Sequence, residues 1–249
     1  MSAVATRARA QAPNRMYRLG HLANAADSEA FTRQITLPEL ARLGFVEGRT
    51  LVFDARVGPP DALPRLMEEL LAAKPDAIDA VGPAIAVAGK ATRSVPTGLA
   101  GNEAALQKAA ERLGVKLLVF TVATSGEYPA AFAAMQAQGA QALLIGATPQ
   151  FQADGKQLAG LALQGRLPTV CEWPDMARAG CLIGYGPSRT ALRKRMAAQI
   201  AQIFRGVAPG SIPIERPTAL ELALNLGIAK SLGLKFPDAL LATAGELVE

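Results

Sequence analysis

The stretch TLVFDARVGPPDALPRLMEELLAAKPDAIDAVGP, residues 50–83, carries the pattern that decides the fold class. Residues 50–57 are mostly apolar and precede a Gly-Pro pair, which predicts a strand. Over residues 63–71 the apolar positions recur at helical spacing, and Pro75 ends the expected helix. A second apolar run, residues 77–81, indicates another strand. Because two parallel strands need a crossover between them, this strand–helix–strand order predicts a parallel α/β sheet.

The same alternation continues outward from this stretch in both directions. Further strands are expected at residues 17–22, 115–122, 141–146, 168–172 and 181–185. Further helices are expected at residues 31–43, 83–92, 102–113, 128–138 and 154–164. The predicted fold class is therefore α/β, with doubly wound parallel sheets that carry helices on both faces. In such sheets, ligands bind at the carboxyl ends of the strands.

The composition excludes several classes of partner. Half of the 249 residues are apolar and 19% are charged, which is typical of a globular chain with one or two cores. The net charge is +5, but the densest basic group, residues 189–195, lies on one expected amphipathic helix, and we interpret it as a solvated face. With 5% aromatic residues, we expect no nucleic acid partner. No apolar run approaches the roughly 20 residues of a bilayer span, so we expect no stable membrane insertion.

The two cysteines, Cys171 and Cys181, do not form a metal-binding pattern. No second pair of cysteines and no histidine lies at ligand spacing from them. Each lies in or beside an expected strand, which favours two buried free thiols. The alternative is a disulfide, which would need an oxidising compartment.

Residues 82–91 imitate a phosphate-binding loop, because a Gly-Lys pair follows an expected strand. A Walker A motif would need glycine at Ala84 and serine or threonine at Ala91, and both positions fail. No serine lies in a G-x-S-x-G elbow. We therefore expect no enzyme activity and no cofactor. An enzyme on a doubly wound scaffold is the third alternative, because the fold does not fix the function.

Several short motifs are together similar to one protein family. They lie at residues 17–22, 43–49, 66–70, 167–170, 184–187, 217–226 and 229–234. They resemble the substrate-binding proteins of ABC transporters, in the branch whose characterised members bind tryptophan, tyrosine or related small molecules. The resemblance implies two lobes of the periplasmic binding protein type I kind, which close on a ligand by hinge bending.

The resemblance also implies a gap in the middle of this chain. In relatives, the segment after Pro96 continues into a strand, a ligand-lining loop and the crossing to the second lobe. Here we expect a block on the order of forty to fifty residues to be missing, which would leave both lobes incomplete. The expected lobes are residues 15–96 with 188–208, and residues 97–187 with 209–249.

Residues 1–14 resemble the remnant of a leader or linker. They contain an A-x-A site of the kind that ends a secretory signal, but they lack its apolar core. The resemblance implies a periplasmic location, and the cytoplasm is the alternative.

The resemblance places the ligand site at the strand ends. Its expected members are Asn24, Gly82, Pro83, Ala84, Thr148, Phe151, Glu172, Trp173 and Tyr185. The turn at residues 82–84 offers backbone N–H groups to a ligand carboxylate, and an ordinary strand-to-helix turn is the equal alternative. His21, the single histidine, is interpreted as a packed side chain.

The remaining site residues divide by chemistry. Trp173 and Phe151 would enclose a flat apolar ligand, and a core or hinge position is the equal alternative for Trp173. Glu172, Asn24 or Thr148 would hold an amino or hydroxyl group. The predicted function is therefore the solute-binding component of an ABC uptake transporter, which captures an amino-acid-like or aromatic molecule between two lobes and delivers it to an ABC permease. The alternative is a cytoplasmic or degenerate ligand-sensing remnant with no transport role.

Overall fold

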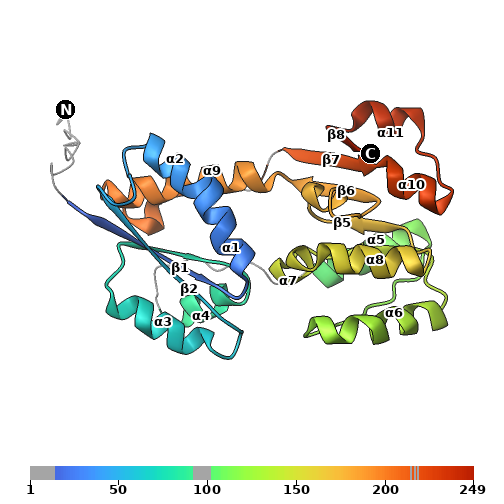
Figure 1. Ribbon diagram of the computed structural model, residues 1–249, viewed down its shortest axis with the longest axis horizontal. Coiled ribbons are helices and arrows are strands. Elements are labelled where there is room, and N and C mark those ends of the chain that lie inside the picture. The colour runs from blue at the N-terminus through green and yellow to red at the C-terminus, as the bar shows by residue number, and fades with distance from the viewer. Residues whose placement is uncertain (1–14, 92–101, 214, 216, 218) are drawn as a thin grey trace, which may run out of the picture. The chain divides into compact units, whose positions relative to one another are not determined.

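The computed structural model describes residues 15–91, 102–213, 215, 217 and 219–249. Contacts within the chain divide it into two compact units, each built on its own sheet (Figure 1). Unit 1 comprises residues 1–97 and 189–216, and unit 2 comprises residues 98–188 and 217–249. The leader remnant and the deletion expected after Pro96 lie outside the described residues. The lobe bounds expected from the resemblance stay a prediction.

In the described residues, unit 1 has a three-stranded parallel sheet in the order β2-β1-β3. Its strands are β1 (Tyr17–Ala23), β2 (Leu51–Val57) and β3 (Ala77–Ala80). Its helices are α1 (Ala26–Phe31), the π-helix η1 (Thr32–Thr36), α2 (Leu37–Arg42), α3 (Leu63–Ala72), α4 (Ala84–Ala91), α9 (Arg189–Phe204) and the 3-10 turn η4 (Pro209–Ser211). Leu22 pairs with Arg56 on one side and with Ala80 on the other, so the three strands end at the same edge.

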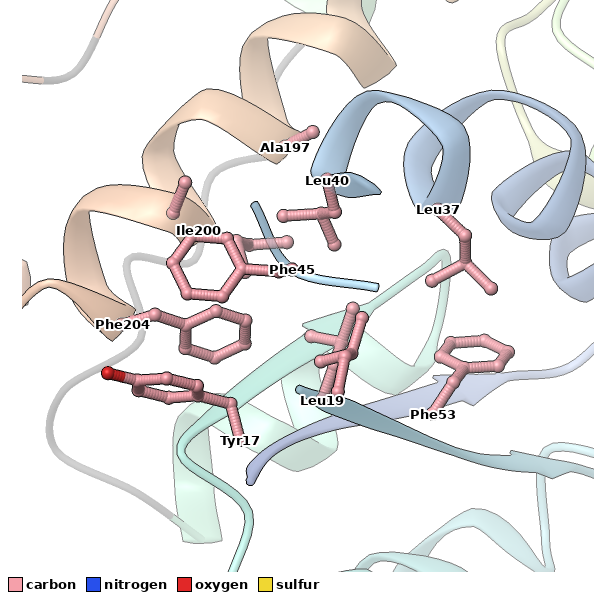
Figure 2. Close-up of a cluster of buried hydrophobic side chains, with 11 residues drawn as sticks. Tyr17, Leu19, Leu37, Leu40, Phe45, Phe53, Ala197, Ile200 and Phe204 are labelled. Atoms are coloured by element: carbon pink, nitrogen blue, oxygen red, sulfur yellow. The ribbon is translucent and has the colours of Figure 1, made fainter. Parts of the chain in front are cut away.

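The two faces of β1 contribute to two separate cores. Tyr17 and Leu19 pack with Phe45 and Phe204 beneath α2 and α9 (Figure 2). From the opposite face, Leu22 packs against residues of α3 and α4. Alternating side chains of one strand are thus buried by helices on both sides, as expected for a parallel sheet.

Unit 2 has a five-stranded sheet in the order β4-β5-β6-β7-β8, parallel except for the antiparallel pair β6–β7. Its strands are β4 (Leu143–Ile145), β5 (Thr169–Cys171), β6 (Ile183–Pro187), β7 (Leu220–Asn225) and β8 (Glu246–Val248). Its helices are α5 (Asn102–Leu113), η2 (Ser125–Glu127), α6 (Tyr128–Ala137), α7 (Pro149–Ala153), α8 (Gly155–Gln164), η3 (Pro174–Ala177), α10 (Leu226–Leu232) and α11 (Asp238–Thr243).

The main core of unit 2 lies between β4, β5, α6 and α8. Phe132 and Met135 of α6 and Leu158 of α8 pack there with Ile145. A smaller cluster joins Leu182 to Ala229 and Leu232 of α10. Among the residues that the structure describes, no helix has the length and apolar character needed to cross a membrane.

The α/β class with parallel-dominated sheets is confirmed, and most expected elements form within a few residues of their expected bounds. The strand expected at residues 115–122 is wrong, since this segment is irregular in the structure. Phe120 and Val122 pack against the core, whereas Val115 and Val119 are 58% and 60% exposed. A strand needs a partner for its backbone hydrogen bonds, and none of the described strands pairs with this segment.

The preference for free thiols is also wrong, because Cys171 and Cys181 form a disulfide with a Cα–Cα distance of 6.4 Å. Cys171 ends β5, and Cys181 lies shortly before β6. Val170 of β5 pairs with Ile183 of β6, so the two cysteines lie on adjacent chain segments of the sheet. That separation lies within the range that a disulfide can bridge.

Candidate ligand-binding site

Two of the expected site segments lie together at the carboxyl edge of the unit 1 sheet. Asn24 directly follows β1, and the turn at residues 82–84 follows β3. The Val81 N–H donates to the Leu22 carbonyl at 3.0 Å, which extends the pairing of the two strands to their ends. The structure therefore places Asn24 and the strand-to-helix turn after two neighbouring strands of one sheet.

Asn24 carries an unsatisfied acceptor at this edge. Its side-chain Oδ1 is buried and has no hydrogen-bond partner within the described part of the chain. A buried amide oxygen without a donor costs free energy, so such an atom is commonly completed by water or by a ligand.

The turn before α4 has the geometry of a helix N-terminus. Gly82 has a φ of +63°, a left-handed conformation that glycine adopts without steric cost. The Ala84 side chain is fully buried in the core with α3. Ala84 can therefore offer only backbone to a ligand, whereas Pro83 has no N–H to give.

The second group of site residues lies at the carboxyl edge of the unit 2 sheet. Ile145 of β4 pairs with Cys171 of β5, so the segments that follow both strands start side by side. The Glu172 carboxylate accepts a hydrogen bond from the Ala147 N–H at 2.7 Å. Glu172 thus fixes the loop after β4, a role that its place in the sequence did not reveal.

Thr148 and Phe151 are joined by a helix cap. The Thr148 Oγ1 accepts from the Phe151 N–H at 3.1 Å and so caps α7. The Phe151 ring lies edge-on to Tyr128, with 6.2 Å between ring centres, and packs against the main core. Phe151 is therefore partly a core residue.

Behind Phe151 lies a small polar group. The Tyr128 hydroxyl donates to Asp154 at 2.7 Å, and the Gln150 amide donates to the same carboxylate oxygen at 2.5 Å. Burial and the Asp154 carboxylate together raise the pKa of Tyr128, so its hydroxyl stays protonated at neutral pH. A cavity of about 60 Å³ adjoins this group and is lined mainly by apolar side chains.

Trp173 and Tyr185 differ in exposure. Trp173 is partly buried and packs against the main core, whereas Tyr185 of β6 is 50% exposed.

Two glycines beside Tyr185 allow the loop after β5 to lie directly on β6. A Cβ at Gly186 would meet the Glu172 carbonyl oxygen at 2.0 Å, and one at Gly184 would meet the Pro174 oxygen at 2.6 Å. Sequence reasoning missed this contact, although the Gly-x-Gly spacing was visible.

A buried polar cluster in unit 1 was also missed. The Asp79 Oδ2 bonds to His21 Nδ1 at 2.9 Å and to Arg193 Nη1 at 2.8 Å, and the Thr32 hydroxyl lies 3.4 Å away. Burial opposes the ionisation of Asp79, but the His21 and Arg193 contacts outweigh it and hold the pKa of Asp79 below its ordinary value. His21 is fully buried, so its interpretation as a packed residue is confirmed.

This cluster joins β1, β3, η1 and α9 and has the character of a structural ion pair. Among the described residues, no group of three or more His, Cys, Asp or Glu side chains could hold a metal ion.

Comparison with known proteins assigns the family. Residues 101–248, more than half of the chain, match the family described as ABC transporter substrate binding protein. The chain belongs to the ABC transporter substrate-binding protein family. Its members bind the substrates of transporters and are not enzymes. No curated protein matches this substrate-binding protein.

Solved structures share the fold of this substrate-binding protein. A conserved domain protein from Vibrio cholerae has a TM-score of 0.84 at 18% identity, with 94% of this chain and 100% of that chain covered. The ABC domain in complex with L-Trp from Streptococcus pneumonia has a TM-score of 0.82 at 16% identity, with the same coverage. A ligand-free, open substrate-binding protein with adhesive properties from Clostridium difficile has a TM-score of 0.62 at 14% identity, covering 94% and 99%. At these identities the similarity concerns the fold.

Proposed function

We propose that this substrate-binding protein captures a small amino-acid-like or aromatic molecule and delivers it to an ABC permease. The observation that carries this proposal is the unpaired Oδ1 of Asn24, at the strand edge next to the turn before α4. An ammonium group would satisfy that acceptor. The N–H groups at the start of α4 would attract a carboxylate. An acceptor and an anion-attracting turn at one edge match the two charged groups of an amino acid.

The aromatic part of the proposal rests on unit 2. Trp173, Tyr185 and Phe151 all lie at or near the carboxyl edge of its sheet. Aromatic rings there suit a flat apolar side chain, which they would contact face-on or edge-on. The complex of the Streptococcus pneumonia structure with L-Trp makes L-tryptophan the first probe to test.

Replacement of Asn24 tests the ammonium contact. Asn24→Ala removes the acceptor oxygen, and we expect the affinity for L-tryptophan to fall by roughly tenfold or more, since a lost charge-assisted hydrogen bond costs about 1.5–3 kcal/mol. Asn24→Asp keeps an acceptor oxygen at the position and should retain binding. Isothermal titration calorimetry on both variants and the parent protein gives the comparison. Equal affinities in all three would contradict a role for Asn24.

The disulfide and the family both support a periplasmic location, which is part of the proposal. Disulfides persist in oxidising compartments, which favours a periplasmic protein that serves a permease over a cytoplasmic ligand-sensing remnant. Fractionation of the source cells tests this choice. Recovery with the periplasmic marker supports transport, and recovery with reduced cysteines in the cytoplasm would support the remnant.

A further inference from the structure

We propose that the Cys171–Cys181 disulfide holds the loop bearing Glu172 and Trp173 in its shape, so that the candidate ligand-binding residues of this loop are held in place only in the oxidised chain. This inference rests on the proposed function, because it treats that loop as part of the ligand site. It adds a redox requirement that the family assignment does not contain.

The disulfide joins the two ends of this loop. Cys171 is the last residue of β5, and Cys181 precedes β6, so residues 172–180 form a closed ring. Both cysteines are fully buried and pack against Met176 of η3 inside the loop. The disulfide therefore anchors both ends of the loop in the main core of unit 2.

The first half of the loop makes close contacts on two sides. The Glu172 carboxylate holds the Ala147 N–H of the loop after β4. On the other side, the backbone of residues 172–174 lies against Gly184 and Gly186 of β6, where no Cβ would fit. A small displacement of Cys171 would disturb both contacts, because Glu172 follows it directly.

The second half of the loop has anchors that do not depend on sulfur. The Asn225 amide donates to the Ala177 carbonyl at 2.8 Å, and Arg178 forms an ion pair with Glu246. Just outside the loop, the Leu182 N–H donates to the Thr169 hydroxyl at 2.9 Å. We therefore expect loss of the disulfide to loosen mainly residues 172–174, while the fold of unit 2 persists.

The redox step balances by thiol–disulfide exchange. The two cysteine thiols lose two protons and two electrons to form the S–S bond, and the disulfide of an oxidant such as oxidised glutathione is reduced to two thiols. Because the bond is buried, a reductant reaches it only when the loop or the unit opens. The site would thus be completed after transfer into an oxidising compartment and stay complete there.

The chain offers a direct reporter of this loop. Trp173 is its single tryptophan, and Cys171 and Cys181 are its only cysteines. Tryptophan fluorescence and its quenching by acrylamide therefore report the loop alone, without any ligand. Thiol titration of the denatured chain counts the disulfide without ambiguity.

The experiment compares three forms of the full chain: oxidised parent, parent refolded with dithiothreitol, and the Cys171→Ala/Cys181→Ala variant. We expect the melting midpoint to fall by roughly 5–15 °C without the disulfide, with helical circular dichroism retained. Acrylamide should quench Trp173 more strongly in both forms that lack the disulfide. Calorimetric affinity for L-tryptophan should fall roughly tenfold or more, because the loop is no longer preorganised. Dithiothreitol should leave the variant unchanged.

Three outcomes overturn the inference: two free thiols in the oxidised parent, equal Trp173 quenching in all forms, or equal L-tryptophan affinity with and without the bond. A fourth outcome separates it from the proposed function. If Trp173 responds to the loss of the disulfide but no form binds L-tryptophan, the redox control of the loop stands and the amino-acid ligand does not.

Discussion

Asp79 is a buried carboxylate that side chains from β1, η1 and α9 approach. The Arg193 side chain that contacts it is 13% exposed, so removal of the carboxylate charge would leave a poorly hydrated guanidinium. We expect Asp79→Asn to lower the free energy of unfolding by about 3–5 kcal/mol, as for other broken buried ion pairs. Urea unfolding at pH 7 measures this loss. The matched control is Glu69→Gln, an exposed ion-pair carboxylate, which should cost less than about 1 kcal/mol.

The lowered pKa of Asp79 predicts that the stability of the fold depends on pH. The pKa of Asp79 is lower in the folded chain than in the unfolded chain, because the His21 and Arg193 contacts overcome the cost of burial. The unfolded chain therefore binds more protons as the pH falls below about 4, and this stabilisation is lost as the pH drops through the folded pKa. We expect the stability difference between the parent and Asp79→Asn to shrink from pH 5 to pH 3. A constant difference over that range would contradict a charged Asp79.

At the scale of elements, the contact between β6 and the loop after β5 depends on missing side chains. Gly186→Ala would place a Cβ 2.0 Å from the Glu172 carbonyl oxygen, and backbone on both sides leaves little room to move. We expect a loss of about 1–3 kcal/mol or more from overpacking, together with a change in Trp173 fluorescence.

Gly160→Ala provides the control for that substitution. Gly160 lies in α8 of the same unit with open space around its Cβ position, so alanine there should stabilise by roughly 0.5–1 kcal/mol. Thermal melts of Gly186→Ala, Gly160→Ala and the parent protein measure the two changes in stability. A neutral Gly186→Ala would show that the loop does not rest on β6.

For the whole molecule, ligand binding should appear as added stability. A ligand that binds only the folded chain adds about 2.7 kcal/mol at a hundredfold excess over Kd. We expect L-tryptophan or a related aromatic amino acid to raise the melting midpoint by roughly 5–10 °C at that excess. Branched amino acids, purines and small organic acids form the comparison panel. A shift with purines alone would redirect the proposal to another ligand class.

Local sequence pattern was sufficient for most elements of the fold. Apolar spacing and turn residues such as Pro75 located most of the helices and strands before residue 186, since these signals act over a few neighbouring residues. The expected parallel sheet also placed Asn24 and the turn at residues 82–84 at the carboxyl ends of its strands, and the strand order that makes them neighbours came from the structure.

Pairing over long distances needed the folded chain. Asp79 meets residues 58 and 114 positions away in sequence, and the Cys171–Cys181 bond depends on how β5 and β6 are paired. Residues 115–122 have the composition of a strand, yet none of the described strands supplies their partner. The sequence likewise indicated Glu172 as a ligand contact, but in the folded chain its carboxylate also accepts a hydrogen bond from the Ala147 N–H. Such contacts depend on which segments pack together in the folded chain. Local sequence pattern acts over a few neighbouring residues and does not specify which distant segments pack together.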